Sequence, residues 1–322
     1  MPVVNPNTMR ALRQTSTAGP RDLRLVDDVP VPTPGPGEVL VRVTAAGVNF
    51  ADVMQTRGTY GGGPRPPYTA GFEAAGEVVA PGPGTTAPAV GAHVVGTGSG
   101  AFAEYAVLEA GSTMPVPEGW ADEQALGLVL NWATALAALR PLGRVAAGET
   151  VLVRAAAGGV GQAAVRLAKH YGATVVATAS PGKHEVVRAL GADRVLDYGD
   201  CDAVGPVDLV LESVGASFAA SLRAARPVTG RVVVYGEAGG EAAVTNRQLV
   251  FEHQVHVIGL HVGVLAREAP EVFAGLVDEL AALRGAGVLT PGRPVVHGLA
   301  DGPRVLAALE ARATVGKQVL KP

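Results

Sequence analysis

A run of small residues, AAAGGVGQAA, fills positions 155–164, between a short apolar stretch and a stretch with helical character. A strand, a glycine-rich turn and a helix in this order form the setting in which a protein backbone holds a dinucleotide. We place Ala156, Gly158 and Gly161 on the three glycines of G-x-G-x-x-G. Gly158 then lets a pyrophosphate approach the backbone, Gly161 lets the helix pack on the strand, and the helix N-terminus directs N–H groups at the phosphates. The predicted phosphate-binding residues are Ala157, Gly158, Gly159, Val160 and Gly161.

The same turn has a second interpretation, as a glycine-rich joint that only packs a helix on a strand. Ala156 replaces the first glycine of the fingerprint, which weakens the motif. The turn nevertheless follows the first strand of a series of β–α units, which is the position that a dinucleotide fingerprint requires. We therefore favour the cofactor-binding interpretation.

The end of the following strand indicates which dinucleotide binds. NAD sites carry an acidic residue about 20 residues after the glycine turn, but ATASPGKHE (177–185) has no Asp or Glu at the strand tip. Ser180 is a candidate helix N-cap. Lys183 follows it by three residues, where a cation opposes the helix dipole at a cost of about 0.3–1 kcal/mol. The 2′-phosphate of NADP would reverse that sign, so we predict NADP(H). The alternative is an exposed lysine that tolerates the small cost.

The elements around the turn predict two kinds of domain. Short β-type runs separated by Gly/Pro turns predict a compact, barrel-like β domain, and they lie at 23–32, 38–48, 76–80, 92–96 and 101–108. From about residue 122, strands alternate with helices, which predicts a doubly wound parallel sheet. Its expected strands lie at 151–154, 174–178, 194–198, 208–213, 231–235 and 255–259. The tail is predicted to form a helix, a strand, a helix and a strand at 268–284, 294–299, 302–312 and 317–320.

Composition limits the class of protein. A chain of 322 residues is long enough for two domains. A net charge of −3 and an aromatic content of 4%, with no long basic run, argue against nucleic-acid binding. Cys201 is the single cysteine, so an internal disulfide framework is excluded. The N-terminal residues lack an apolar signal core, and the longest apolar stretch, 125–139, is too short for a bilayer. We expect a cytoplasmic protein that has no membrane or nucleic-acid partner.

Several segments together carry a resemblance to a known family. They are GVNFAD (47–52), RGTY (57–60), PYTAGFEAAGEV (67–78), AAAGGVGQAAVRLAKHYGATVVATAS (155–180), LGADRVLDY (190–198) and ESVG (212–215). The chain resembles the zinc-independent, zeta-crystallin-like quinone oxidoreductases of the medium-chain dehydrogenase/reductase superfamily. The resemblance implies an α/β fold with a GroES-like β-barrel catalytic domain (1–125 and 263–322). It also implies a Rossmann NADP(H)-binding domain with a doubly wound parallel sheet (126–262), and a homodimer, or a tetramer of dimers, that pairs through the Rossmann sheet edges.

The resemblance also assigns residues to the cofactor. Lys183 and Tyr198 match residues that hold the adenosine phosphate end of NADPH, and Arg312 matches an arginine that joins them. Thr134 begins a helix that relatives place near the nicotinamide. Ligands of an open α/β sheet bind at the carboxyl ends of the strands. The further cofactor contacts expected there are Ser180, Val214, Gly215, Tyr235, Gly236 and His261.

The substrate side is predicted from the segment after the second long β run. By the resemblance, Asn49 lines the nicotinamide and substrate cleft, and Tyr60 is an aromatic at its mouth. Phe50 and Met54 complete a predicted apolar cleft, and Met54 stands where many relatives carry an aromatic residue. The alternative for Asn49 is to satisfy loop backbone groups, and the alternative for Tyr60 is to cover the cleft.

The metal ligands of alcohol-oxidising relatives are missing from the corresponding triplet. Those relatives bind zinc with a cysteine, the histidine of a GHE triplet and another ligand, whereas this chain has Gly71-Phe72-Glu73 and no cysteine nearby. Tetrahedral zinc needs three or four N, S or O ligands, so we expect no metal. Hydride addition to a quinone or a conjugated enone needs no Lewis acid, because the new charge spreads to a distant oxygen that one or two donors stabilise.

The sequence therefore predicts an NADPH-dependent, metal-independent reductase of quinones or α,β-unsaturated carbonyls. One alternative is an enoyl or alkenal reductase that acts on a biosynthetic or thioester intermediate. Another is a non-enzymatic NADPH-binding protein with a crystallin-like or RNA-binding role, although the charge and the few aromatic residues count against RNA.

Overall fold

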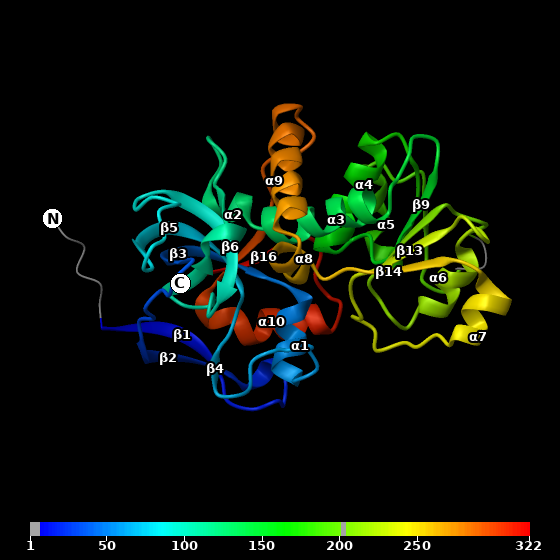
Figure 1. The fold of residues 1–322 in the computed structure, drawn as a ribbon. Helices are drawn as coiled ribbons and strands as arrows, with labels where there is room; N and C mark the ends of the chain where they lie inside the picture. The colour runs from blue at the N-terminus through cyan, green and yellow to red at the C-terminus, as the bar shows by residue number, and fades with distance from the viewer. Residues whose placement is uncertain (1–6, 201–203) are drawn as a thin grey trace. The chain divides into compact units, whose positions relative to one another are not determined.

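The computed structural model describes residues 7–200 and 204–322, so Cys201 and the first six residues lie outside it. The described residues divide into two compact units (Figure 1). The first unit runs to Leu130 and resumes at Pro291–Pro322, and the second is Asn131–Thr290. The first unit is thus split along the chain, and the second unit is inserted between Leu130 and Pro291.

The first unit is built on a closed β-barrel. Strand β3 (Glu38–Val48) pairs with β5 (Glu73–Pro81) and also with β7 (Tyr105–Glu109), while β6 (His93–Ser99) joins β5 to β7. The other strands of this unit are β1 (Thr8–Gln14), β2 (Leu23–Pro30), β4 (Tyr68–Thr69), β8 (Met114–Pro115), β15 (Val295–Gly298) and β16 (Gln318–Lys321). The C-terminal strand β16 pairs with β3, which attaches the end of the chain to the barrel. The expected GroES-like barrel is confirmed.

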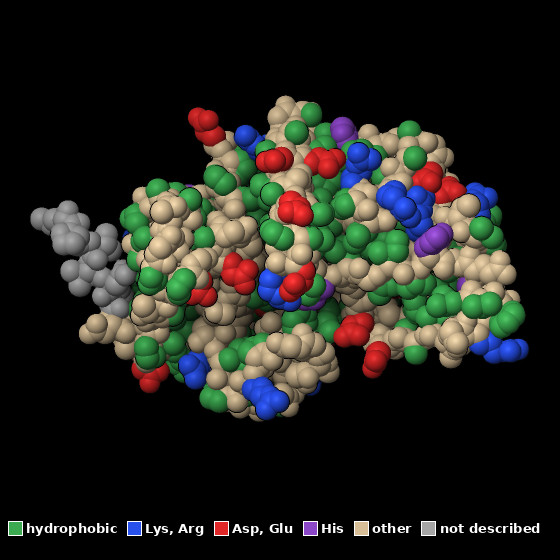
Figure 2. Space-filling model, viewed as in Figure 1, with side chains coloured by type: hydrophobic (Ala, Val, Ile, Leu, Met, Phe, Trp, Pro, Cys, Tyr) green, Lys and Arg blue, Asp and Glu red, His purple; other side chains and the backbone are tan. Residues whose placement is uncertain are grey.

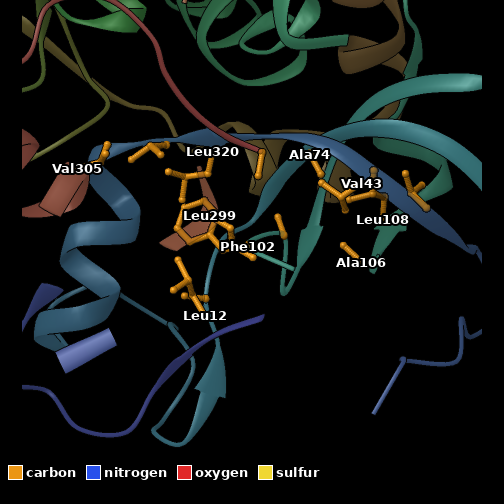
Figure 3. Close-up of a cluster of buried hydrophobic side chains, with 14 of the residues drawn as sticks. Leu12, Val43, Ala74, Phe102, Ala106, Leu108, Leu299, Val305 and Leu320 are labelled. Carbon is orange, nitrogen blue, oxygen red and sulfur yellow. The ribbon is translucent and has the colours of Figure 1, made fainter. Parts of the chain in front are cut away.

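Figure 3 shows the larger of two apolar clusters in the first unit, and the smaller one includes Met9, Leu40 and Tyr105. Alternate residues of β3, Val39, Val41 and Val43, belong to the larger cluster, because successive side chains of a strand point to opposite faces. Phe102 and Leu108 come from the following strands and loops and are fully buried. The helices of this unit are α1 (Phe50–Arg57), α2 (Asp122–Ala125) and α10 (Gly302–Glu310), with short turns η1 (Pro20–Asp22), η2 (Ala110–Ser112) and η8 (Leu299–Asp301).

The second unit is a six-stranded parallel sheet in the order β11-β10-β9-β12-β13-β14. These strands are β9 (Thr150–Val153), β10 (Thr174–Thr178), β11 (Arg194–Leu196), β12 (Leu209–Glu212), β13 (Arg231–Val234) and β14 (His256–Gly259). From β9 the chain adds strands first on one side (β10, β11) and then on the other (β12, β13, β14). The crevice between β9 and β12 is therefore the topological switch point, where such sheets bind ligands. The predicted doubly wound Rossmann sheet is confirmed.

Helices complete the second unit. They are η3 (Leu128–Trp132, at its border), α3 (Ala133–Ala137), η4 (Ala138–Leu142), α4 (Gly159–His170), η5 (Pro181–Lys183), α5 (His184–Ala189), α6 (Phe218–Ala224), α7 (Asn246–Gln248), η7 (Leu249–His253), α8 (Val262–Glu268) and α9 (Pro270–Gly285). Helices α8 and α9 belong to this unit by packing, whereas the expected boundary at 263 places them with the barrel. The reason is that α9 packs on α3, with Phe273, Leu276 and Leu280 buried.

The apolar stretch at 125–139 forms part of a longer helical run, Asp122–Leu142, than the sequence predicts. Among the described residues this run is the one helix long and apolar enough to cross a membrane by length and composition. In its most apolar window 67% of the residues are buried inside the protein, as in a core helix. The cytoplasmic location stays a prediction.

Candidate functional site

The glycine-rich turn joins β9 to α4, as predicted. Gly158 is the N-cap of α4 and has extended backbone, and its N–H donates to the carbonyl oxygen of Ala155 at 3.0 Å. Ala155 has a φ of 50°, which lets the chain leave the sheet sharply. The N–H of Ala156 donates to Thr178 O at 3.0 Å, which ties the turn to the end of β10. The turn is thus fixed by its own backbone bonds at the carboxyl edge of the sheet.

The three small positions of the turn have different surroundings. A Cβ added at Gly161 would lie 2.4 Å from Ala155 O and 2.6 Å from Ala156 Cα, so this glycine permits close packing of α4 on the strand end. A Cβ added at Gly158 would have, within 4 Å, only Ala155 O at 3.3 Å. No side chain among the described residues covers Gly158. At Gly159 the neighbour is the side chain of Asn131, at 2.9 Å. This difference between Gly158 and Gly161 is the one that a dinucleotide fingerprint requires.

The next strand tip carries the residues predicted for the 2′-phosphate. Ser180 is the N-cap of η5, and Lys183 is its last residue, with its N–H donating to Ser180 O at 2.8 Å. Tyr198 follows the neighbouring strand β11, whose Leu196 pairs with Thr178 of β10. Ser180 therefore lies two residues after Thr178, and Tyr198 lies two residues after Leu196, its partner on the neighbouring strand. The structure thus places the backbones of the predicted adenosine-end residues of this unit at one edge of the sheet.

The loop after β12 is held by a buried carboxylate. Glu212, the last residue of β12, accepts hydrogen bonds from the backbone N–H groups of Val214 at 2.6 Å and Gly215 at 3.1 Å. Its carboxylate also accepts from the hydroxyls of Ser217, at 3.0 and 3.2 Å, and Ser221. Gly215 has a φ of +75°, and a Cβ there would meet Gly240 O. The two loops beyond β12 and β13 are therefore packed backbone to backbone.

Arg154 is the charged neighbour of this carboxylate. It directly follows β9, and its Nε donates to Ser221 Oγ at 3.0 Å and lies 3.9 Å from Glu212 Oε2. Neither charged side chain has exposed surface. A fully buried arginine is rare unless it is paired. This pair sits at the switch point between β9 and β12.

Three further predicted cofactor residues lie at the carboxyl edge of the sheet. Tyr235 and Gly236 follow β13, and the Tyr235 N–H donates to Glu212 O at 2.9 Å. Burial, with the charge of Glu212 adding to it, raises the pKa of the Tyr235 hydroxyl. His261 is the N-cap of α8, where its Nδ1 accepts from the N–H of Val264 at 3.2 Å. Because the ring caps this helix, His261 has a structural role in addition to its predicted role at the cofactor.

The predicted substrate residues belong to the first unit, around the start of α1. Asn49 is the N-cap of α1, and Phe50 and Met54 lie on that helix, half-buried. Tyr60 follows the helix and is also half-buried. The side-chain amide of Asn49 donates to Gly47 O at 3.2 Å and to Glu73 Oε2 at 2.9 Å. The first bond is of the kind that the alternative interpretation of Asn49 describes, and the second adds a carboxylate partner.

A buried ion pair fixes that amide. Lys317 Nζ donates to Asn49 Oδ1 at 2.7 Å and to the carboxylate of Glu73. The other oxygen of Glu73 accepts from the N–H of Gly127 at 2.6 Å. Glu73 has no exposed surface, and the Lys317 side chain is 13% exposed. A Cβ at Gly47 would lie 2.2 Å from Glu73 Oε2, so this glycine makes room for the cluster.

A second carboxyl group lies beside this cluster. Asp52 Oδ2 accepts from the backbone N–H of Asn49 at 2.8 Å, and the side chain is buried. Burial raises the pKa of Asp52 to about 8, against the lowering effects of the Asn49 N–H and the Lys317 ammonium group. Burial and the Asp52 charge also raise the pKa of Tyr60, and that of Tyr68 to about 12. Asp52 is therefore mostly protonated at neutral pH, and the phenols keep their protons.

Two predicted cofactor residues remain. Thr134 lies on α3 and is buried in the second unit. Arg312 follows α10 in the first unit, is exposed, and has a φ of 58°. Lys183 and Tyr198 belong to the second unit, whereas Arg312 belongs to the first.

Sequence reasoning missed Glu73 and Lys317 as a pair, and also Arg154 with Glu212. The available signal was a charged residue at the end of an apolar strand, in VLVR (151–154) and in DLVLE (208–212). Phe72 takes the place expected for a metal-binding histidine. Among the described residues there is no group of three or more His, Cys, Asp or Glu that could hold a metal ion.

Two family models match the chain. The alcohol dehydrogenase GroES-like domain matches residues 35–118, and the zinc-binding dehydrogenase domain matches residues 159–282. These matches fall on the barrel and on the Rossmann sheet. The fold and the site so far define an oxidoreductase with a GroES-like domain and a dinucleotide-binding Rossmann domain.

Relatives narrow this class. The chain is 37% identical over 288 residues, 86% of its length, to the pikromycin polyketide synthase component PikAII of Streptomyces venezuelae, but spans only 7% of that protein. A mycobacterial structure complexed with NADPH is 35% identical with a TM-score of 0.91, covering 98% of this chain and 100% of the other.

Two further solved structures are similar. Escherichia coli quinone oxidoreductase complexed with NADPH is 28% identical with a TM-score of 0.88, covering 97% of this chain and 100% of the other. CurK enoyl reductase is 26% identical with a TM-score of 0.86, covering 98% of this chain and 99% of the other. The chain belongs to the quinone oxidoreductase-like family of the medium-chain dehydrogenase/reductase superfamily, whose members bind NAD(P).

Proposed function

We propose that the chain is an NADPH-dependent reductase that transfers a hydride to a quinone or an α,β-unsaturated carbonyl without a metal. The observation that carries the proposal is the turn at the start of α4, where no described side chain covers Gly158. Backbone N–H groups at a helix N-terminus favour phosphate, and Ser180 and Lys183 stand at the tip of the neighbouring strand. The NADPH in the mycobacterial and E. coli structures supports the same cofactor here.

The nicotinamide, when bound, supplies the hydride, and the protein must stabilise charge on the acceptor. Donors aimed at the developing negative charge make the largest contribution in such reactions. Asn49 is one candidate donor, and its longer bond, to Gly47 O at 3.2 Å, is the one that a substrate oxygen would replace. Tyr60 is the second candidate, because its phenol is a hydrogen-bond donor at neutral pH. Phe50 and Met54 supply the apolar wall beside them.

A substrate screen tests the proposal. Purified protein is incubated with NADPH and a panel of naphthoquinones, alkenals and enoyl thioesters, and NADPH oxidation is followed. We expect turnover with naphthoquinones or simple enones, and much slower turnover with NADH. Absence of turnover with every acceptor, in protein shown to bind NADPH, would contradict the proposed reaction.

A second candidate is an enoyl reductase acting on a thioester or other biosynthetic intermediate. The similarity to PikAII and to CurK enoyl reductase favours it. The same panel separates the two functions, because this candidate requires turnover of enoyl thioesters at rates above those with quinones.

A non-enzymatic NADPH-binding or RNA-binding role is the remaining alternative. The face in Figure 2 shows Lys and Arg side chains interspersed with Asp and Glu. Salt-sensitive RNA affinity needs clustered cations, so this face gives no support to RNA binding. RNA binding that weakens steeply with salt, without turnover of any acceptor, would support the alternative.

We also propose a homodimer that pairs through the edge strand β14 of the Rossmann sheet. Exposed apolar side chains gather near this edge, with Phe251 73% and Val250 55% exposed. Val257 on β14 is itself 38% exposed. An edge strand presents unpaired backbone groups that a second copy can satisfy. Val257→Lys should give a monomer in analytical ultracentrifugation, and an unchanged dimer would place the interface elsewhere.

A further inference from the structure

The Rossmann unit contains a buried ion pair between Arg154 and Glu212. Arg154 and Glu212 have no exposed surface, and their Nε and Oε2 atoms are 3.9 Å apart. Removing two charges from water costs several kcal/mol for each ion, and apolar residues of similar volume often stabilise a protein as well or better. Such a pair is therefore weak evidence for a stabilising role, and its contacts must show what else it does.

The position of the pair links two loops at the switch point. Arg154 directly precedes Ala155, which begins the glycine turn, and Glu212 directly precedes the loop at 213–216. Strands β9 and β12 are adjacent and parallel, with Val153 opposite Leu211, and the Arg154 N–H donates to Leu211 O at 3.1 Å. The two charges thus stand where the two loops leave the sheet.

The carboxylate makes most of its contacts with the loop. Glu212 Oε1 accepts from the N–H groups of Val214 and Gly215, and both oxygens accept from Ser217. An ionised carboxylate with several donors makes stronger hydrogen bonds than a neutral amide. The Arg154 guanidinium group lies beside Glu212 Oε2. It also donates to the Ser221 hydroxyl, which in turn donates to the same carboxylate oxygen.

The loop after β12 is hydrogen-bonded to the loop after β13. The Gly239 N–H donates to Val214 O at 2.7 Å, and the Ala238 N–H donates to Ser213 O at 3.1 Å. At Gly215 an added Cβ would clash with Gly240 O, so this glycine permits the close approach of the two loops. Two loops at the carboxyl edge therefore depend on the Glu212 carboxylate.

We propose that Arg154 and Glu212 are positioning residues that fix the loop at 213–216 against the glycine turn and so set the affinity for the nicotinamide half of NADPH. This inference rests on the proposed NADPH site. The glycine turn holds its shape through its own backbone bonds, so the phosphate and adenosine half depends much less on this pair. The charge pair thus controls one end of the dinucleotide.

Two ligands, one with and one without the nicotinamide half, test whether the ion pair affects only that half of the dinucleotide. Dissociation constants for NADPH and for 2′,5′-ADP, which lacks the nicotinamide half, are measured by calorimetry for the wild type, Glu212→Gln and Arg154→Met. Glu212→Gln should weaken NADPH by about tenfold, as expected for the loss of charged hydrogen bonds. Its affinity for 2′,5′-ADP should change by less than about threefold. Equal weakening of both ligands, or of neither, would overturn the proposal.

Amide exchange provides a readout without ligand. In Glu212→Gln the amides of Val214 and Gly215 should exchange at least about tenfold faster, while those of α4 stay protected. The control is the exposed pair Arg226 and Asp208 at the other end of the same strand, with Nε and Oδ1 2.9 Å apart. Asp208→Asn should leave the ratio of the two dissociation constants and the exchange of Val214 unchanged.

Two outcomes keep this inference separate from the proposed function. If the wild type binds neither NADPH nor 2′,5′-ADP, the proposed function fails, and the exchange of Val214 still tests the positioning of the loop. If Glu212→Gln does not fold, Ser217→Ala removes the bifurcated hydrogen bond that this hydroxyl donates to the two carboxylate oxygens, and it keeps both charges. Ser217→Ala should raise the ratio of the NADPH to the 2′,5′-ADP dissociation constant by about threefold. An unchanged ratio in that variant would overturn the proposal.

Discussion

Lys317 and Glu73 are 244 residues apart in the chain, yet the Lys317 ammonium group donates a hydrogen bond to the fully buried Glu73 carboxylate. The bond joins the residue directly before the C-terminal strand β16 to the first residue of β5 of the barrel. The same ammonium group holds Asn49 Oδ1 at 2.7 Å. The C-terminal segment therefore completes the polar cluster at the start of α1, and it closes the barrel unit that the inserted Rossmann unit interrupts.

Lys317→Met should destabilise the protein strongly. It leaves the Glu73 charge buried without its cation, which costs about 3–5 kcal/mol when a buried pair is broken. The free energy of unfolding is measured by urea denaturation. Lys321→Met is the control, because Lys321 pairs with Glu123 and is 43% exposed, and exposed pairs contribute about 0–1 kcal/mol. The double variant Glu73→Gln/Lys317→Met should recover part of the loss. Equal small losses in both lysine variants would contradict the buried pair.

Asp52 predicts a pH dependence of stability. Its pKa is raised from the ordinary value of 3.8 to about 8, chiefly by burial. Between those values the folded protein binds a proton that the unfolded chain does not, so stability falls as the pH rises. The slope from this one group is at most about 1.4 kcal/mol per pH unit.

Asp52→Asn should flatten that slope between pH 4 and 8, in unfolding free energies measured at several pH values. Asp27→Asn, at an exposed position, is the control and should keep the wild-type slope. If the wild type loses less stability than Asp52→Asn as the pH rises from 4 to 8, the direction of the pKa shift of Asp52 is refuted.

Much of the fold could be predicted from local pattern. The strand at 174–178 and the helix from Gly159 lie where the sequence predicts them, because β-branched runs and a glycine turn are local signals. The strand Thr8–Gln14 was not predicted. It forms a separate three-stranded sheet with β2, the next strand along the chain, and with the more distant β4. The packing of α9 with the Rossmann unit likewise depends on contacts with α3 that no local pattern records.

The candidate site likewise has a part that the sequence could predict and a part that it could not. The turn at Gly158 and Gly161 could be predicted because a fingerprint is contiguous in sequence. The partners of Asn49 could not, since Glu73 and Lys317 reach it from 24 and 268 residues away. Arg154 with Glu212 was missed for a related reason, because a charge at the end of a strand shows neither its burial nor its partner.

Lys183→Ala tests the choice of nucleotide. If Lys183 binds the 2′-phosphate, its loss removes a charged hydrogen bond of about 1.5–3 kcal/mol. The NADPH dissociation constant should therefore rise about 10- to 100-fold and the NADH constant by less than about threefold. Lys169→Ala is the control, since Lys169 forms an exposed pair with Asp193. Equal weakening of both nucleotides in Lys183→Ala would remove the phosphate role.

Asn49→Ala separates chemistry from cofactor binding. If Asn49 donates to the acceptor oxygen, kcat should fall about 100-fold, as for the loss of an oxyanion donor. The NADPH dissociation constant should stay within about twofold, because that effect belongs to the reaction step. Asn246→Ala, at an exposed position of α7, is the control. An unaltered kcat would show that the Asn49 amide serves only Gly47, Glu73 and Lys317.

Gly158 and Gly161 form a matched pair, because the same added methyl group meets different surroundings. At Gly161 it would lie 2.4 Å from Ala155 O, so Gly161→Ala should lose about 1–3 kcal/mol of unfolding free energy through overpacking. At Gly158 it would meet one oxygen at 3.3 Å, so Gly158→Ala should stay within about 0.5 kcal/mol of the wild type. Its methyl group would instead occupy the approach of the pyrophosphate and weaken NADPH by about tenfold or more. Urea denaturation measures the unfolding free energy of both variants, and calorimetry measures their affinity for NADPH. A Gly158→Ala protein that binds NADPH as tightly as the wild type would show that the phosphates lie elsewhere.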